Sequence, residues 1–233
     1  MKFYFRSHGA VLCLLGCTLL FLAPFVAFAA DADTEASLDS AIKAVDEKDF
    51  SKAFTIFSRL AEAGNPEAQY NLAMLYRTGK GVAKDPVASL RWFRRAAEQG
   101  VADAQYYMGY FYDNGEGVTQ DPKKAFAWYR KAAEQGHGLA QINLGVLYAT
   151  GMGVRRDIEQ AYLWFHVAAA QGYKRAFENR LVIETGLKAQ GEQGLARLEA
   201  LKQKARTYFQ RYVEPFAIKP PPFRGNRQVP PGH

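Results

Sequence analysis

Few residues of this chain have the types and spacing that catalysis requires. Ser40 and Lys43 have the S-x-x-K spacing with which penicillin-recognising serine enzymes pair a hydroxyl nucleophile with a lysine. The S-D-N and K-T-G motifs that accompany it in those enzymes are absent from the sequence. The related string Thr78-Gly79-Lys80 belongs to a loop that a structural repeat explains. A serine active site at Ser40 is therefore only an alternative hypothesis.

The other reactive side chains also lack partners at a useful spacing. The histidines beyond the first segment stand alone in the sequence: His137, His166 and His233. His166 replaces Arg94 and Arg130 of earlier repeats, which indicates a surface position. Glu98 and Glu134 recur with the repeat and are therefore expected on solvated helix faces. We expect no catalytic, cofactor-binding or metal-binding residue, and hence no enzymatic activity.

Residues 1–30 have the three parts of a secretory signal peptide. A basic start is followed by an apolar run, Ala10–Phe28, and then by small residues in an A-x-A pattern. We expect cleavage after Ala29 or Ala30, which places the protein in the periplasm or outside the cell. An uncleaved membrane anchor is the alternative, because the run approaches the roughly 20 residues that span a bilayer. A lipoprotein signal at Cys17 is a weaker alternative, since the residue at Leu15 is bulky.

Cleavage of this signal would remove several reactive or charged groups. Both cysteines, Cys13 and Cys17, lie within it, so the mature chain would have no disulfide, thiol nucleophile or thiolate metal ligand. Loss of Lys2 and Arg6 from 30 basic residues leaves 28 against 23 acidic residues, a net charge of +5. Export argues against a nucleic-acid partner. An acidic protein, an anionic glycan or an anionic membrane face remains compatible with this charge.

The C-terminal segment 214–233 differs in composition from the rest of the chain. It contains six prolines, including Pro220-Pro221-Pro222 and Pro230-Pro231. Proline lacks a backbone donor and favours extended polyproline structure. We therefore predict a non-globular tail, either disordered or used as a binding arm.

The middle of the chain repeats itself every 36 residues. Glycine recurs at this spacing, and so do an Ala-Gln pair, a tyrosine, a Gly-x-Gly-Val string, an aspartate and a tryptophan. The recurring glycines are Gly64, Gly100, Gly136 and Gly172, and the tryptophans are Trp92, Trp128 and Trp164. Because the tryptophans recur once per repeat, we assign them to the core between helices rather than to a ligand site.

Each repeat has the pattern of two helices. In the first repeat, apolar residues at helical spacing predict a helix over 66–77, which the glycine pair Gly79/Gly81 ends. A second helix begins at Asp85-Pro86, where aspartate caps the free amides and proline suits the first helical position. Single hairpins of this kind cannot bury their own apolar faces, so they stack into a solenoid. Ala73, Gly109 and Gly145 are expected to let neighbouring helices approach closely.

These motifs together resemble the Sel-one-like repeat (SLR) family. The resemblance rests on Ala68-Gln69-Tyr70-Asn71-Leu72, on the Gly-x-Gly-Val loop with its aspartate, and on the Trp-aromatic-x-x-Ala-Ala-x-x-Gly ending. It implies the tetratricopeptide-like superfamily and an all-α fold: a right-handed superhelical solenoid of stacked αα-hairpins with a C-terminal capping helix. Three full repeats cover 64–171, divided into 64–99, 100–135 and 136–171.

The segments on either side of the three repeats are expected to be irregular. Residues 31–63 are predicted to form a degenerate helical hairpin that lacks the glycine loop. Residues 172–213 begin like another repeat but lose its Gly-x-Gly-Val string and its tryptophan. An apolar stripe from Leu195 to Tyr212, with basic residues opposite, predicts a helix that caps the last repeat.

The resemblance implies that the first helix of each repeat lines a concave face that holds a partner. An extended or helical peptide could place its side chains against such a face. The partner-binding residues predicted on this basis are Glu67, Tyr70, Met74, Arg77, Asp103, Tyr106, Tyr110, Asp113, Ile142 and Val146. The family thus implies a scaffold that binds a protein or peptide partner in the cell envelope.

Two other functions stay open from the sequence. Some relatives of this repeat family bind penicillin or act as β-lactamases, but they resemble a cysteine-rich subtype that this mature chain does not match. Exposed aromatic residues and the +5 charge are also compatible with a protein that binds peptidoglycan or another glycan. The sequence does not indicate an oligomeric state.

Overall fold

The computed structural model describes residues 38–216, and every regular element in this range is a helix. The predicted signal peptide and its two cysteines lie outside the described residues, as does most of the proline-rich tail. Contacts divide the chain into two compact units, and the boundary between them in the sequence falls between Asp121 and Pro122. Each unit is described by itself. The all-α architecture of consecutive helical hairpins predicted from the repeat is confirmed.

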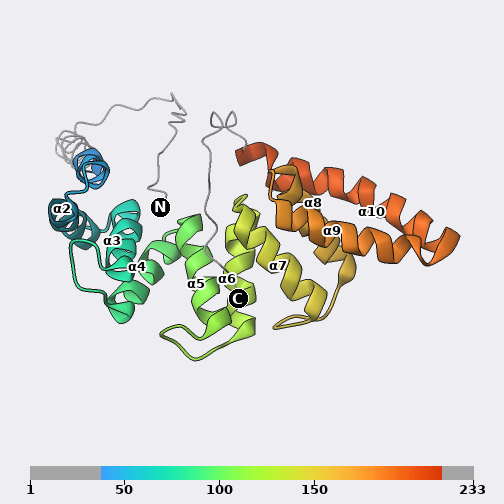
Figure 1. The fold of residues 1–233 in the computed structure, drawn as a ribbon, viewed down its shortest axis with the longest axis horizontal. Coiled ribbons are helices and arrows are strands. Elements are labelled where there is room, and N and C mark those ends of the chain that lie inside the picture. The colour runs from blue at the N-terminus through green and yellow to red at the C-terminus, as the bar shows by residue number, and fades with distance from the viewer. Residues whose placement is uncertain (1–37, 217–233) are drawn as a thin grey trace, which may run out of the picture. The chain divides into compact units, whose positions relative to one another are not determined.

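The first unit consists of helices that pack on their neighbours in chain order (Figure 1). A helical segment over 38–46 precedes four helices: α2 (Phe50–Glu62), α3 (Pro66–Thr78), α4 (Pro86–Glu98) and α5 (Ala102–Asn114). Helix α3 packs against both α2 and α4, and α4 packs against α5. The predicted helix 66–77 is therefore present and one residue longer than expected.

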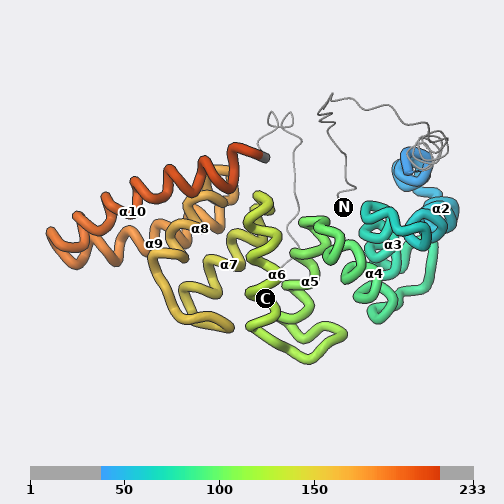
Figure 2. The backbone as a smooth tube through the Cα atoms, turned by 180° about the vertical axis from the view of Figure 1, so that it is seen from behind, coloured from blue at the N-terminus to red at the C-terminus, as the bar shows by residue number. Residues whose placement is uncertain are grey.

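The second unit continues the same order and then changes it (Figure 2). Its helices are α6 (Pro122–Glu134), α7 (Gly138–Thr150), α8 (Ile158–Ala170), α9 (Lys174–Lys188) and α10 (Gly191–Tyr212). Helix α10 packs against both α8 and α9, as a cap would. A short 3₁₀ helix, Glu214–Phe216, follows α10 and contacts it. The first three residues of the predicted extended tail are thus helical.

The predicted start and stop signals act where the sequence places them. Gly79 and Gly115 end α3 and α5 with φ of 70°, in the left-handed region that glycine adopts without strain. Asp85 caps α4 by accepting hydrogen bonds from the amides of Val87 and Ala88, both at 2.9 Å. Asp157 caps α8 in the same way, with two amide contacts at 3.0 Å. These local bonds satisfy helix-end amides that would otherwise lack partners.

A glutamine that recurs every 36 residues joins each hairpin to the one before it. The side-chain nitrogens of Gln69, Gln105 and Gln141 donate to backbone carbonyls eight residues earlier, at 3.1–3.2 Å. The accepting carbonyls belong to Ala61, Ala97 and Ala133, in the last turn of the preceding helix. Gln99 and Gln171, at the ends of α4 and α8, donate in turn to the oxygens of Gln69 and Gln141 at 2.7 Å. The amides of Gln69 and Gln141 are therefore buried and hydrogen-bonded through both their nitrogen and their oxygen at a helix junction.

Gly145 and two of the three tryptophans have the core positions predicted for them, whereas Trp128 does not. A Cβ on Gly145 would lie 2.6 Å from the Phe165 ring, so only glycine lets α7 and α8 approach this closely. The Ser89 hydroxyl donates to the Ala73 carbonyl at 3.0 Å across α3 and α4. Trp92 and Trp164 are buried, while Trp128 is partly exposed, with the Lys131 ammonium over its ring at 4.2 Å.

The repeat ends in α9, where two positions of the 36-residue pattern no longer have the residue types found in the earlier repeats. Phe177 stands 36 residues after the bonded Gln141, and Leu181 stands 36 residues after Gly145. Both side chains are about half exposed, at 48% and 46%. Helix α10 instead buries Leu198, Leu201 and Ala205 against Tyr162 and Leu163 of α8. Leu195, predicted for the buried stripe of α10, is also exposed at 48%.

The loop glycines of the first unit allow a matched stability test. Gly81 and Gly117 have the same repeat position and nearly the same φ, 71° and 72°. A Cβ at Gly81 would overlap the carbonyl oxygen of Phe50, whereas one at Gly117 would meet nothing within 4 Å. We expect Gly117→Ala to cost about 1–2 kcal/mol of backbone strain. Gly81→Ala should cost at least ~2 kcal/mol more, because the loop must also move away from α2. Urea unfolding of both variants measures the difference, and equal midpoints would contradict the close approach.

Candidate functional site

Three of the predicted partner-binding residues are buried in the structure. Tyr70 is 4% exposed, and its ring lies edge-on to Phe93 at 5.7 Å. Burial, reinforced by the nearby Asp103 carboxylate, holds the pKa of Tyr70 well above its usual value. Met74 is 8% exposed, so it too contributes to packing. Their prediction as surface residues was wrong: both are buried in α3, and Tyr70 is covered by Phe93 of α4 and Tyr107 of α5.

The corresponding positions of the second unit are more apolar. Ile142 is buried against Ala161 and Phe165 of α8, so its prediction as a surface residue was also wrong. Val146 is partly exposed and packs on the edge of the same cluster. This face of α7 has few polar groups that could orient a ligand.

The remaining predicted residues are partly exposed, and all of them lie on α3 and α5 of the first unit. They are Glu67, Arg77, Asp103, Tyr106, Tyr110 and Asp113. Together these side chains carry three carboxylates and one guanidinium group. This face of the first unit is therefore acidic and rich in tyrosine.

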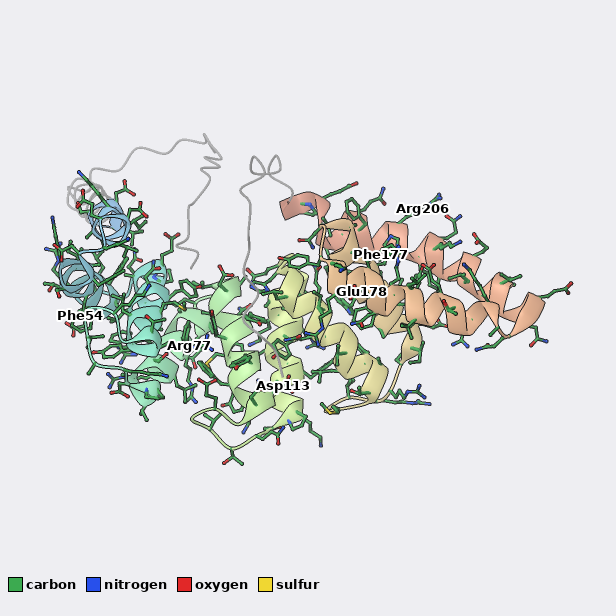
Figure 3. The ribbon with its side chains drawn as sticks, in the orientation of Figure 1. Phe54, Arg77, Asp113, Phe177, Glu178 and Arg206 are labelled. Atoms are coloured by element: carbon green, nitrogen blue, oxygen red, sulfur yellow. The ribbon has the colours of Figure 1, made fainter. Side chains whose placement is uncertain are left out.

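Arg77, labelled in Figure 3, lies on α3 with its guanidinium group over aromatic rings of α5. Its Cζ atom lies 4.7 Å from the ring centroid of Tyr107 and 5.3 Å from that of Tyr110. Tyr107 in turn stacks on Phe93 of α4, with ring centroids 4.6 Å apart and an interplanar angle of 30°. A cation over aromatic faces is attracted by their quadrupoles, which fixes the guanidinium group in place. We call Arg77, Tyr106, Tyr107 and Tyr110 the arginine–tyrosine cluster.

Tyr107 was not among the predicted site residues. It occupies the repeat position of Asn71 and Asn143, and this departure from the pattern is the sequence signal that marks it. Burial raises the pKa of its hydroxyl, while the Arg77 charge opposes the shift. The hydroxyl therefore stays protonated at neutral pH, and the ring serves as a fixed platform between Phe93 and Arg77.

A second polar group of the structure joins α8 to α9. The Tyr162 hydroxyl donates to the Glu184 carboxylate at 3.2 Å, and the Arg180 Nε atom lies 3.3 Å from the same carboxylate oxygen. The Arg180 Nη1 atom lies 3.4 Å from the His166 Nδ1 atom. Burial and the Glu184 charge raise the pKa of Tyr162 to about 12. These contacts tie the two helices together.

His166 is half-buried in this group, so its prediction as a surface residue was wrong. The error arose because Arg94 and Arg130, at the same repeat position, are exposed. Burial lowers the pKa of His166, and the Arg180 charge adds to that effect. The imidazole is thus held in its neutral form at neutral pH. His137, by contrast, caps α7, where its Nδ1 atom accepts from the amide of Ala140 at 3.1 Å.

The S-x-x-K pair lies on an exposed helix surface. Ser40 and Lys43 both fall in the helical segment 38–46, and the Lys43 side chain is 76% exposed, with its ammonium 3.8 Å from Glu47. The Thr78 hydroxyl donates to the Met74 carbonyl at 2.8 Å, and the Lys80 ammonium lies over the Phe50 ring at 4.8 Å. None of these contacts encloses a substrate or isolates the lysine from water.

Two further searches cover residues 38–216. Within this range, no three His, Cys, Asp or Glu side chains come together in a way that could hold a metal ion. In the same part of the chain, no helix is both long enough and apolar enough to cross a membrane.

Comparison with known proteins identifies the repeats as those of a protein family. The family model for the Sel1 repeat matches residues 46–65, 66–101, 102–137 and 138–173. The first match extends into the segment predicted as a degenerate hairpin. No curated protein matches the sequence.

Two solved structures are similar to this chain. A Sel1 repeat protein from Oxalobacter formigenes is 37% identical over 54% of this chain and 94% of its own length, with a TM-score of 0.52. The protective antigen c5321 of uropathogenic Escherichia coli, described as having an SLR fold, is 28% identical with a TM-score of 0.54. That match covers 89% of this chain but 53% of the antigen, so the chain spans about half of its length.

The environment of His166 predicts a pH-dependent stability. Because its pKa is lower in the folded chain than the usual 6.5, the unfolded chain binds this proton more readily. The contribution of neutral His166 is complete above pH ~6.5 and declines as the pH falls from there toward the folded-state pKa. We expect His166→Asn to reduce the loss of unfolding free energy between pH 7 and pH 5, measured by urea titration. An unchanged pH dependence in this variant would show that the contacts to Arg180 and Tyr162 have no such effect.

Proposed function

Because the chain belongs to the Sel1 repeat family, we propose that it is an exported scaffold that binds a protein partner through α3 and α5 of its first unit. Sel1 repeat proteins are generally protein–protein interaction scaffolds and are typically not enzymes. To this general role we add a binding face, on α3 and α5, and export of the protein. Export is supported by the signal-like composition of residues 1–30.

The observation that carries the proposal is the arginine–tyrosine cluster. Tyrosine and arginine are enriched at protein interfaces, where they combine contact area with hydrogen-bonding groups. In this cluster they are only partly buried, yet held in place by Phe93 and by the guanidinium–ring contacts. A surface that is ordered before binding loses less conformational entropy when the partner arrives.

The charges around the cluster indicate the chemistry of the partner. Glu67, Asp103 and Asp113 outnumber the single Arg77, so the face is net acidic. A partner segment with basic side chains next to aliphatic or aromatic ones would match both its charge and its tyrosines. Such a segment could lie across α3 and α5 as an extended strand or a helix.

Loss of a captured partner tests the binding face. The mature protein is immobilised and exposed to a native envelope extract, beside the variant Tyr110→Ala/Asp113→Lys and the control Val87→Ala/Glu98→Lys. The control changes one apolar group and one carboxylate on α4, outside the cluster. We expect the wild type and the control to retain a defined protein. The amount of that protein retained by Tyr110→Ala/Asp113→Lys should be lower by at least ~tenfold.

Equal retention by all three proteins would contradict the proposed face. Retention that depends on purified cell wall and disappears at high salt would instead indicate a glycan-binding protein. A single point mutation that abolishes a hydrolytic activity would contradict the scaffold role altogether.

Export is tested by the N-terminus of the protein recovered from its native cells. We expect the chain in the envelope fraction to begin at Ala30 or Asp31, because signal cleavage follows the small residues of the A-x-A pattern. Intact-mass measurement distinguishes this from a chain that begins at Met1. Recovery of the full-length chain in the cytoplasmic fraction alone would contradict export.

A further inference from the structure

An open recess in the second unit lies between the loop that precedes α8 and the side of α10. Its volume is about 740 Å³. Its lining residues are Tyr148, Val154, Arg155, Arg156, Asp157, Ile158, Glu159, Gln160 and Arg197. Three of these nine residues are arginines, which makes the recess a concentration of positive charge on the second unit.

The two acidic residues of the recess are already engaged. Asp157 accepts from the amides at the start of α8. Glu159 is paired through one carboxylate oxygen with Arg197 Nε at 3.0 Å and through the other with Lys204 Nζ at 3.4 Å. Helix α10 thus supplies two cations to one carboxylate. The local charge stays positive after these pairs are counted.

The arginines use only part of their hydrogen-bonding capacity. Arg156 donates from Nε to the Ala149 carbonyl at 3.0 Å, and Arg197 uses its Nε for Glu159. The terminal guanidinium nitrogens of both residues have no hydrogen-bond partner among residues 38–216, and Arg155 is exposed. An arginine has five N–H donors in a planar fork, so most donors of this recess are available to a ligand.

The other repeats show that these charges exceed what the fold needs. The positions of Arg155 and Arg156 are occupied by Ala83 and Lys84 in the first repeat, and by Thr119 and Gln120 in the second. Gln120 donates to the Asp113 carbonyl at 2.7 Å, which is the same bond that Arg156 makes to Ala149. A neutral side chain therefore supplies the structural bond, and the guanidinium groups add only charge and donors.

We propose that this recess binds an acidic segment of a protein partner, with its carboxylates on Arg155, Arg156 and Arg197. The guanidinium fork matches a carboxylate in two parallel hydrogen bonds. Tyr148, Val154 and Ile158 provide the apolar part of the lining, against which aliphatic side chains of the segment would pack. This inference rests on the proposed function in taking the bound macromolecule to be a protein, but it names a separate surface.

A chain-borne carboxylate fits the recess better than an isolated phosphate. Phosphate sites at helix starts use free backbone amides. Here the Asp157 side chain already occupies the amides of Glu159 and Gln160, so those donors are not available. The remaining donors are spread over an open recess rather than gathered around one anion. Several spaced carboxylates can reach them at once.

Fluorescence anisotropy tests this recess with a labelled hexapeptide of glutamate and leucine, and with its glutamine-for-glutamate counterpart. The key variant is Arg155→Thr/Arg156→Gln, which installs the residues of the second repeat and keeps a donor for the Ala149 carbonyl. We expect the wild type to bind the acidic peptide and the variant to bind it ~tenfold more weakly, as loss of two exposed charge contacts implies. The glutamine peptide should bind the two proteins equally weakly.

The control variant, Lys174→Gln/Arg175→Gln, removes the same charge from α9 of the same unit. It should bind the acidic peptide within about twofold of the wild type, since distant exposed charges are screened by salt. Circular dichroism verifies the fold of each variant, and Arg155→Thr alone replaces the double variant if that one unfolds.

Three results would overturn the proposal. The first is an affinity of the Arg155→Thr/Arg156→Gln protein for the acidic peptide equal to that of the wild type. The second is a loss of affinity in the control variant as large as in that double variant, and the third is no binding of the peptide by the wild type. Displacement of the peptide by inorganic phosphate, but not by chloride of equal ionic strength, would assign a phosphate site instead. Stronger binding to phosphatidylglycerol vesicles than to the peptide would assign a membrane surface. None of these results depends on α3 or α5, so the recess can fail while the proposed binding face stands.

Discussion

Successive hairpins of this chain are joined by a glutamine whose amide lies in a buried junction between helices. Its nitrogen bonds a carbonyl in the last turn of the preceding helix, and in Gln69 and Gln141 its oxygen accepts from a second glutamine. A buried amide without partners costs about 1–3 kcal/mol, so the bonds restrict the junction to one arrangement. The spacing of the apolar residues drives the stacking, but it tolerates sliding. The glutamine bonds are directional, and they set the register in which helices such as α3 meet their neighbours.

The hairpins were predictable because their signals are local. Gly79 and Asp85 act within a few residues of themselves, through a left-handed backbone conformation and through hydrogen bonds to nearby amides. The exposure of single side chains was less predictable. Tyr70 and Tyr106 have the same repeat position, yet Tyr70 is buried by Phe93 and Tyr107, and Tyr106 is partly exposed. Repeat position alone does not define a surface when the residues packed around it differ.

The most informative positions were those at which one repeat departs from the others. Tyr107 replaces an asparagine and becomes the platform for Arg77, and Arg155 replaces a small residue and faces a recess. His166 also departs from the pattern, but its burial was not predictable because Arg180, which contacts it, and Glu184, which pairs with Arg180, come from the next helix, beyond the regular repeat. Contacts of this kind depend on tertiary packing and have no signature in a 36-residue period. The two units consequently present opposite chemistry, acidic and tyrosine-rich on α3 and α5, basic beside α10.

Phe177 and Leu181 have a consequence for how such a chain can change its length. A whole 36-residue unit duplicated or deleted ahead of Gly172 would find at each junction the same glutamine, small residue and loop, so no contact type would be lost. Helix α9 has Phe177 where the repeat places a donor to the preceding carbonyl, and a regular second helix packed after α9 would meet Leu181 where it needs a small neighbour. The substitutions in α9 therefore act as a terminator. They mark the point at which α10, rather than a further regular helix, packs on α8 and α9.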